Sequence, residues 1–143
     1  MDEIDDAILQ ELQRDGRMSM AALGSIVGVA PSTVFKRIEK LKKAGIIERF
    51  TIVVSQRCFE HTLVVFLNIR VLPDDKVEVE EFMRGLPAIL EVYEVLEPGD
   101  FFAKVRVQNI TELKQSVLIP LSSLPGVKDI QTIISVRKIK EQN

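Results

Sequence analysis

The chain has few of the residues that build disulfides, metal sites and nucleophilic centres. Its 143 residues include one cysteine, Cys58, and one histidine, His61. A single cysteine excludes a disulfide within the chain, which favours a reducing cytoplasm. Cys58 and His61 have the spacing of half a zinc site, but zinc needs four ligands and no second pair exists. We therefore predict no metal site, no cofactor and, since a nucleophilic centre lacks its residues too, no enzymatic activity.

Long apolar runs and low-complexity segments are also absent. No run approaches the ~18 apolar residues that a membrane span needs. The acidic start, MDEIDDAILQ, lacks the basic and then apolar regions of a signal peptide. There is no glycine-rich phosphate loop and no internal repeat. These absences predict a globular cytoplasmic protein with no membrane partner.

Positive charge is scarce overall but concentrated in one place. The formal net charge is −2. Residues 31–49 nevertheless hold six basic side chains against two acidic ones, whereas residues 1–15 hold six acidic ones against one basic. A local basic cluster is the electrostatic signature of phosphate binding, whatever the total charge. The segment 31–49 is therefore a candidate nucleic-acid interface.

Apolar spacing in the first fifty residues predicts three short helices. The first precedes Gly16 and has apolar residues at intervals of four. The second lies between Ser19, a suitable N-cap, and Gly28, which can take the left-handed conformation that ends helices. The third begins at Pro31, a favoured first helical residue, and stops at Gly45. The last two helices and their short turn predict a helix-turn-helix, whose second helix enters the major groove.

The outward face of the third helix has the chemistry expected of a DNA contact. At 100° per residue, Val34, Ile38 and Leu41 fall on one side, toward the core. The other side is hydroxyl, aromatic and basic, and such side chains bind phosphates, base edges or a thymine methyl. A merely solvated face is the alternative. The predicted DNA-contacting residues are Ser32, Thr33, Phe35, Lys36, Arg37, Lys40 and Lys43.

Beyond residue 45 the hydrophobic period changes. IIERFTIVV, residues 46–54, is β-branched and apolar and predicts a strand or hairpin arm. The rest predicts the order βαββαβ, a ferredoxin-like arrangement, so the fold class is α+β. In chain order these elements are expected at 61–71, 76–86, 88–97, 101–108, 110–124 and 127–140.

Two details of this second part are specific predictions. In the helix at 76–86, the candidate core residues are Val77, Phe82 and Met83. In the helix at 110–124, Pro120 removes one hydrogen bond and should kink or split the helix.

At this point the sequence resembles the Lrp/AsnC family of prokaryotic transcription regulators, also called feast/famine regulators. The resemblance runs from IDDAILQELQRDGRMS through VGVAPSTVFKRIEKLKKAGIIERFT to LPGVKDIQTIISVRKIK, with YEV and GDFFAKVRV between them. It implies an N-terminal helix-turn-helix, winged or plain, and a C-terminal ligand-sensing ferredoxin-like domain. The expected division is a DNA-binding domain at 1–50, a linking strand or hinge at 51–60, and an effector-binding and oligomerisation domain at 61–143.

The resemblance also implies partners. It implies dimers that assemble into larger rings, commonly octamers, with an amino acid bound between C-terminal domains of neighbouring dimers. Asp100 matches a family aspartate and Thr132 a family threonine. The carboxylate of Asp100 suits an ammonium, and backbone N–H groups of the turn at Gly99 suit a carboxylate. The expected effector-binding residues are therefore Gly99, Asp100 and Thr132.

Three positions depart from the family pattern. Ala30 stands where the family usually has a capping serine, a loss that typically costs about 1 kcal/mol. Glu97 stands at a usual glycine, and Ile130 replaces a threonine. The added negative charge of Glu97 favours either a more cationic effector, such as a basic amino acid, or an empty site with constitutive DNA binding.

The leading hypothesis is a sequence-specific DNA-binding transcription regulator that responds to an amino acid or related small molecule. It would be a homodimer at least, reading a palindromic operator in double-stranded DNA. Two alternatives remain: a low-specificity architectural DNA-binding protein without an effector, and a ligand-sensing regulatory subunit of a metabolic enzyme. The basic helix argues against the second, because such a subunit has no need of it.

Overall fold

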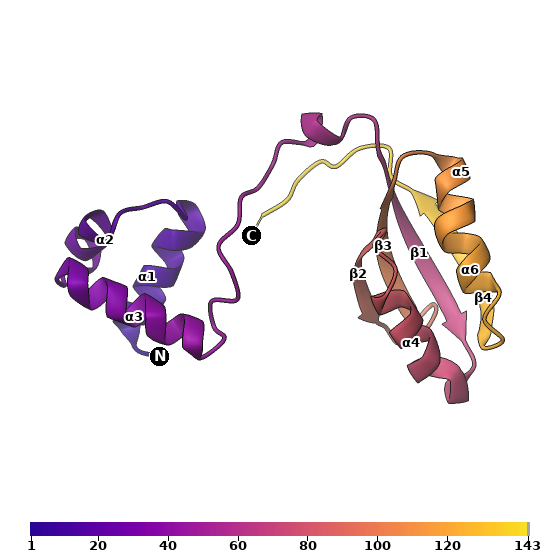
Figure 1. The fold of residues 1–143 in the computed structure, drawn as a ribbon, viewed down its shortest axis with the longest axis horizontal. Helices are drawn as coiled ribbons and strands as arrows, with labels where there is room; N and C mark the ends of the chain where they lie inside the picture. The colour runs from indigo at the N-terminus through magenta and orange to yellow at the C-terminus, as the bar shows by residue number, and fades with distance from the viewer. Residues whose placement is uncertain (143) are drawn as a thin grey trace. The chain divides into compact units, whose positions relative to one another are not determined.

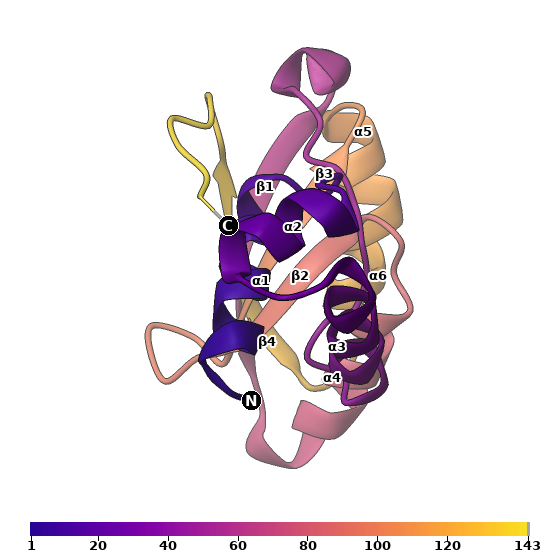
Figure 2. The same cartoon turned by 90° about the vertical axis from the view of Figure 1, so that its left-hand side faces the viewer.

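The computed structural model describes residues 1–142 and separates them into two compact units, Met1–Ser55 and Gln56–Gln142. Figures 1 and 2 show helices only in the first unit and a sheet with helices in the second. Within residues 1–142, no helix is long and apolar enough to cross a membrane.

Three helices build the first unit, as predicted, and each of the first two begins at a polar cap. Asp2 and Asp5 form a capping box, in which each carboxylate accepts the backbone N–H of the other residue. The Ser19 hydroxyl accepts the N–H of Ala22. Gly28 ends the second helix with φ = 76°, in the left-handed region. The helices are α1 (Glu3–Arg14), α2 (Met20–Val27) and α3 (Pro31–Lys43).

A small apolar core joins these helices. Ile8, Leu23, Val34 and Ile38 are buried together. Gly24 lies inside α2, where glycine costs roughly 1 kcal/mol relative to alanine. A Cβ on Gly24 would lie 2.5 Å from the carbonyl oxygen of Val29. The turn before α3 therefore packs on α2 at a distance that only glycine allows.

The strand expected at 46–54 is wrong, and of the linking strand or hinge expected at 51–60 the strand is wrong as well. Among the described residues, no strand lies between α3 and Leu63, and Gln56–Phe59 forms a short 3-10 helix, η1. Ile52 and Val53 are 76% and 70% exposed. β-Branched residues favour a strand only where a neighbouring strand supplies hydrogen bonds and a packing surface. No described segment of this chain supplies either to residues 46–54.

The second unit confirms the order βαββαβ. Its four strands form one antiparallel sheet in the order β2-β3-β1-β4. The last strand ends at Ile134, earlier than the expected residue 140. The strands are β1 (Leu63–Val71), β2 (Ile89–Glu94), β3 (Phe101–Val107) and β4 (Val127–Ile134). The helical segments are η2 (Pro73–Asp75), α4 (Lys76–Arg84), α5 (Ile110–Glu112), η3 (Leu113–Leu118) and α6 (Ile119–Ser122).

The helices of the second unit pack on one face of the sheet. Alternate residues of β1 and β3 are buried against them, including Val65, Leu67 and Ile69. From α4, Met83 is buried and Phe82 is partly buried, as predicted. The prediction for Val77 is wrong, because it is 74% exposed and Val79 takes its place in the core. Val79 and Met83 are four residues apart and share one helix face, whereas Val77 lies about 200° from Val79.

The helical run before β4 is split, as Pro120 predicts. α5 passes into the π-helical segment η3, and α-helical bonding resumes in α6. Pro120 is the second residue of α6. Proline has no N–H to donate, so a regular hydrogen-bond ladder cannot continue through it.

Candidate DNA interface and effector site

The α3 helix divides into a buried and an outward face, as the angular spacing predicts. Val34, Ile38 and Leu41 are buried. Phe35 is 55% exposed, which counts against its being packed on a neighbour. The helix therefore presents an aromatic, hydroxyl and basic surface that the first unit does not cover. Of the predicted contacts, Thr33 and Arg37 are half-buried, and the exposed ones are Ser32, Phe35, Lys36, Lys40 and Lys43.

The start of α3 has no side-chain cap. Ala30 is extended, with φ = −63° and ψ = 150°, and its side chain makes no capping hydrogen bond. Its carbonyl accepts the N–H groups of Thr33 and Val34. An uncapped helix start leaves backbone N–H groups for an outside acceptor, and phosphate is the ligand that helix N-termini favour.

Arg37 differs from the lysines on the same helix. Its Nη1 lies 2.7 Å from Oδ2 of Asp2 and 2.9 Å from Oδ1 of Asp5. The hydrogen bond from this guanidinium is the main reason that the pKa of Asp2 falls from 3.8 to about 2. The structure thus joins Arg37 to the start of α1, a partnership that the sequence analysis missed. No local pattern reveals it, since the partners are 35 and 32 residues away.

A hollow of about 410 Å³ lies beside this ion-pair cluster. Acids of α1 and bases of α3 meet in it, which puts two carboxylates next to the candidate DNA-contacting face. Its lining residues are Met1, Asp2, Asp5, Thr33, Lys36, Arg37 and Lys40.

In the second unit, Asp100 is held by β1 and α4. Its Oδ2 accepts the backbone N–H of Val71 at 2.7 Å, and its Oδ1 lies 3.5 Å from Nζ of Lys76. The Val71 hydrogen bond, with Lys76 adding to it, lowers the pKa of Asp100. The backbone N–H of Asp100 donates to the carbonyl of Ile69. The carboxylate and the amide that the sequence offers to an effector are thus both engaged within the chain.

Gly99 is buried against β1. A Cβ there would lie 2.5 Å from Oδ1 of Asn68 and 2.9 Å from the carbonyl oxygen of Ile69. Thr132 is exposed on β4, opposite Leu67. Because β1 lies between β3 and β4, Thr132 and the Gly99 turn are on opposite sides of β1. One chain does not bring the three expected effector-binding residues together.

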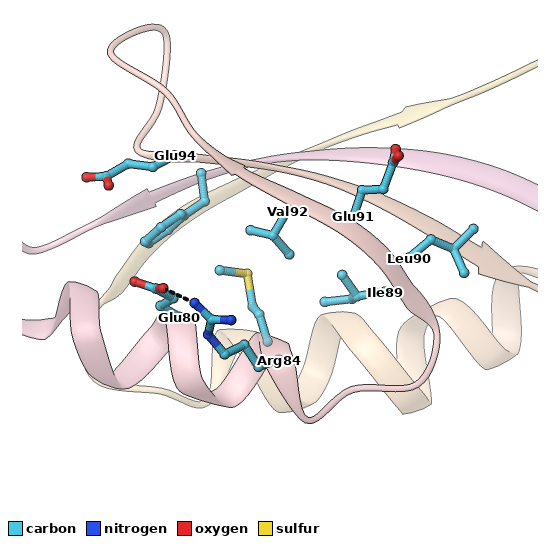
Figure 3. A pocket seen from close by; sticks show the side chains of 9 residues that line it. Glu80, Arg84, Ile89, Leu90, Glu91, Val92 and Glu94 are labelled. Carbon is cyan, nitrogen blue, oxygen red and sulfur yellow. Dashed lines mark hydrogen bonds and ion pairs between the residues drawn. The ribbon is translucent and has the colours of Figure 1, made fainter. Parts of the chain in front are cut away.

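A cavity of about 390 Å³ lies between α4 and the edge strand β2, and none of those three residues lines it, although Phe101, the neighbour of Asp100, does. Figure 3 shows Arg84 at this cavity with its guanidinium directed at Glu80, and their nitrogen and oxygen are 2.7 Å apart. The carboxylate of Glu91 points away from it (Figure 3). No motif in the sequence predicts this cavity. Its apolar lining includes Met83, Ile89, Val92 and Phe101.

Both units match known protein domains. Residues 1–42 match the AsnC-type helix-turn-helix domain, and residues 64–143 match the Lrp/AsnC ligand binding domain. The chain belongs to the Lrp/AsnC family. The resemblance drawn from its motifs is confirmed.

Individual members of the family match over almost the whole chain. The HTH-type transcriptional regulator FL11 of Pyrococcus abyssi is 35% identical, over 99% of this chain and 93% of the relative. The leucine-responsive regulatory protein of Escherichia coli K12 is 31% identical, over 100% of this chain and 89% of the relative. Among solved structures, Escherichia coli AsnC has a TM-score of 0.89 at 25% identity, covering 100% of this chain and 97% of that one.

A complex with a ligand also shares the fold. The regulator NMB0573 of Neisseria meningitidis, solved with L-Met, has a TM-score of 0.84 at 23% identity, covering 99% of this chain and 94% of that one. The relatives are transcription regulators, and this chain is a DNA-binding transcription regulator of the same family. The leading hypothesis from the sequence is confirmed in that respect.

Proposed function

We propose that this regulator reads a palindromic operator as a homodimer and that its second unit senses an amino acid. The observation that supports the first part is the uncovered face of α3, where basic, hydroxyl and aromatic side chains lie together. We assign no catalytic reaction to the chain. The division of labour follows the two units, with DNA binding in residues 1–50 and effector binding and oligomerisation in residues 61–143.

The α3 contacts divide into two groups by chemistry. The lysines Lys36, Lys40 and Lys43 bind phosphates and hold the helix in register. Ser32, Thr33 and Phe35 contact base edges or a thymine methyl and contribute to sequence choice. One helix covers few base pairs, so two copies related by a two-fold axis would read half-sites roughly 34–36 Å apart.

The uncovered face of the sheet is the proposed pairing surface. Phe66 and Phe102 stack on this face with ring centroids 5.8 Å apart, and Tyr93 and Ile133 are 59% and 51% exposed beside them. Apolar side chains gathered on one exposed face are typical of an interface. In the first unit, residues 46–54 separately expose apolar side chains that a second copy can cover. Assembly of such dimers into an octamer is part of this proposal, as the family resemblance implies.

An amino acid is the proposed effector. Residues 64–143 match a ligand binding domain, one relative is named a leucine-responsive protein, and NMB0573 was solved with L-Met. The expected contacts remain Gly99, Asp100 and Thr132. Thr132 and Asp100 lie on opposite sides of β1. A ligand that contacts both kinds of residue therefore needs a second copy of the chain, which agrees with a site between neighbouring dimers. Glu97 favours a cationic amino acid.

Constitutive DNA binding is the second candidate, and one observation favours it. The Asp100 carboxylate already accepts a hydrogen bond from the backbone N–H of Val71 and lies near Lys76, so an effector would have to replace or share these partners.

Selection of bound duplexes from a random pool by the full chain, with and without each of the twenty amino acids, tests the proposal. We expect a palindromic site whose affinity changes with one class of amino acid. Random duplex bound as tightly as any selected site would instead identify an architectural protein. Copurification with a metabolic enzyme and no DNA binding would identify a regulatory subunit.

Calorimetry then locates the effector. Asp100→Ala should abolish amino-acid binding, while Arg84→Ala, in the α4–β2 cavity, should leave it unchanged. If Arg84→Ala abolished binding and Asp100→Ala did not, the effector would lie in that cavity. No heat with any amino acid, together with intact DNA binding, would establish the constitutive alternative.

A further inference from the structure

We infer that Arg37 is a positioning residue whose charge is withheld from DNA, because Asp2 and Asp5 hold it against the start of α1. The ion-pair cluster of these three residues would set the angle at which α3 meets the groove. This inference rests on the proposed function, in which α3 enters the major groove.

The geometry of the cluster supports a fixed arrangement. Nη1 of Arg37 lies 2.8 and 2.7 Å from the two carboxylate oxygens of Asp2 and 2.9 Å from Oδ1 of Asp5. The Arg37 and Asp5 side chains are 25% and 12% exposed and that of Asp2 is 55% exposed, so the Arg37–Asp5 pair is the better shielded of the two. Charge-assisted hydrogen bonds in such a setting are stronger and more directional than those of an exposed surface pair.

The same carboxylates also begin α1. Oδ1 of Asp2 accepts the N–H of Asp5 as well as Nη1 of Arg37, and Oδ2 of Asp5 accepts the N–H of Asp2. The start of α1 and the middle of α3 are therefore tied through shared atoms. Rotation of α3 about its axis would break contacts at both ends of this arrangement. All of the guanidinium's contacts come from one nitrogen, Nη1, while Nε of Arg37 is buried without a hydrogen-bond partner among the described residues.

The charge balance separates Arg37 from the lysines. Two carboxylates face one guanidinium, so the cluster is not a cationic site for phosphate. A residue already paired in the free protein releases no DNA counterion on binding, whereas an exposed lysine that contacts phosphate does. Lys36 and Lys40 line the same hollow without an ion-pair partner among the described residues, so they and not Arg37 are its cations available to phosphate.

The test measures two quantities for the full chain: the dependence of DNA affinity on salt, and the preference for the selected operator over random duplex. For Arg37→Gln we expect an unchanged salt slope and a preference reduced by about tenfold. Lys36→Gln is the matched control on the same helix, and it should lower the slope by about one with little change in preference.

Two further variants sharpen the test. Asp2→Asn with Asp5→Asn should release Arg37, raise affinity for random duplex and increase the salt slope by up to about one. Arg37→Lys keeps the charge on a side chain one atom shorter, so its slope should stay unchanged while its preference stays below that of the wild type.

Folding is controlled separately. Arg37→Gln leaves Asp5 without its charge partner, so the triple variant with Asp2→Asn and Asp5→Asn, which removes all three charges, is measured beside it. Circular dichroism confirms that the helices form. A salt slope that falls by about one in both Arg37→Gln and the triple variant would overturn the inference, because Arg37 would then be a phosphate contact. A wild-type chain that binds no duplex would instead overturn the proposed function itself.

Discussion

The outward lysines of α3 and the acidic side chains around the Gly99 turn differ in how they are paired. Among the described residues, no carboxylate lies within ion-pair distance of Lys36, Lys40 or Lys43. In the second unit, Asp100 and Glu94 both lie near Lys76. The first unit thus presents charge ready for an outside partner. In the second unit, a ligand at the proposed site would have to replace internal contacts of Asp100.

The largest effect is expected from removing the unpaired lysines of α3. Replacing Lys36, Lys40 and Lys43 together by Gln should lower the salt slope by about three and the affinity at low salt by about a thousandfold. The measurement is a duplex titration at several salt concentrations.

Lys42 is the matched control for this change. It lies on the same helix, but its Nζ is 2.9 Å from Glu39. Lys42→Gln should leave the slope almost unchanged. An equal loss from Lys42→Gln would show that pairing does not distinguish these lysines.

The next effect tests the close packing of the turn in the second unit. Gly99→Ala places a Cβ against Asn68 and the backbone of Ile69, so we expect destabilisation by about 2 kcal/mol. Gly85→Ala is the control, because the nearest atom to a Cβ there is 3.6 Å away. The sole tyrosine, Tyr93, lies in β2, so its fluorescence during denaturation reports on the second unit. Equal midpoints for the two variants would contradict the packing at Gly99.

The smallest effect is a loss of stability in acid, carried by one carboxylate in each unit. The folded-state pKa of Asp2 is about 2, and that of Asp100 is also lowered from 3.8. A lowered pKa contributes stability that is complete above the unfolded value, near 4, and is lost as pH falls through the folded value. Asp2→Asn and Asp100→Asn should each flatten the acid dependence of their own unit.

Melting curves between pH 6 and about 2 measure this effect, with helix circular dichroism and Tyr93 fluorescence as the two signals. If Asp2→Asn flattened only the Tyr93 signal, the assignment of each carboxylate to its own unit would be wrong.

Most of the local structure was predictable from residue spacing. Ser19 and Gly28 mark the ends of α2, and Val34, Ile38 and Leu41 define the buried face of α3. The order βαββαβ followed from changes in period along the chain. Local hydrogen bonding and the burial of one face act over a few residues, and the spacing records both.

The wrong predictions concern features that depend on a second segment of the chain. Residues 46–54 have strand composition, but no described segment pairs with them. Val77 is as apolar as Val79, yet only the placement of α4 on the sheet selects which of the two is buried. Spacing alone cannot reveal whether a partner is present or how a helix is rotated on its neighbour.

The residues of this chain specify the family, the two kinds of unit and the outward basic face of α3, because each depends on local pattern and motif. Folding selects the partners of the charged side chains. Arg37 meets Asp2 across 35 positions of the chain, and Asp100 meets Val71 across 29. These pairings distinguish Arg37 from the unpaired lysines of α3 and tie Asp100 to β1. They depend on packing between distant segments, since burial strengthens a charge pair only after the surrounding core has formed.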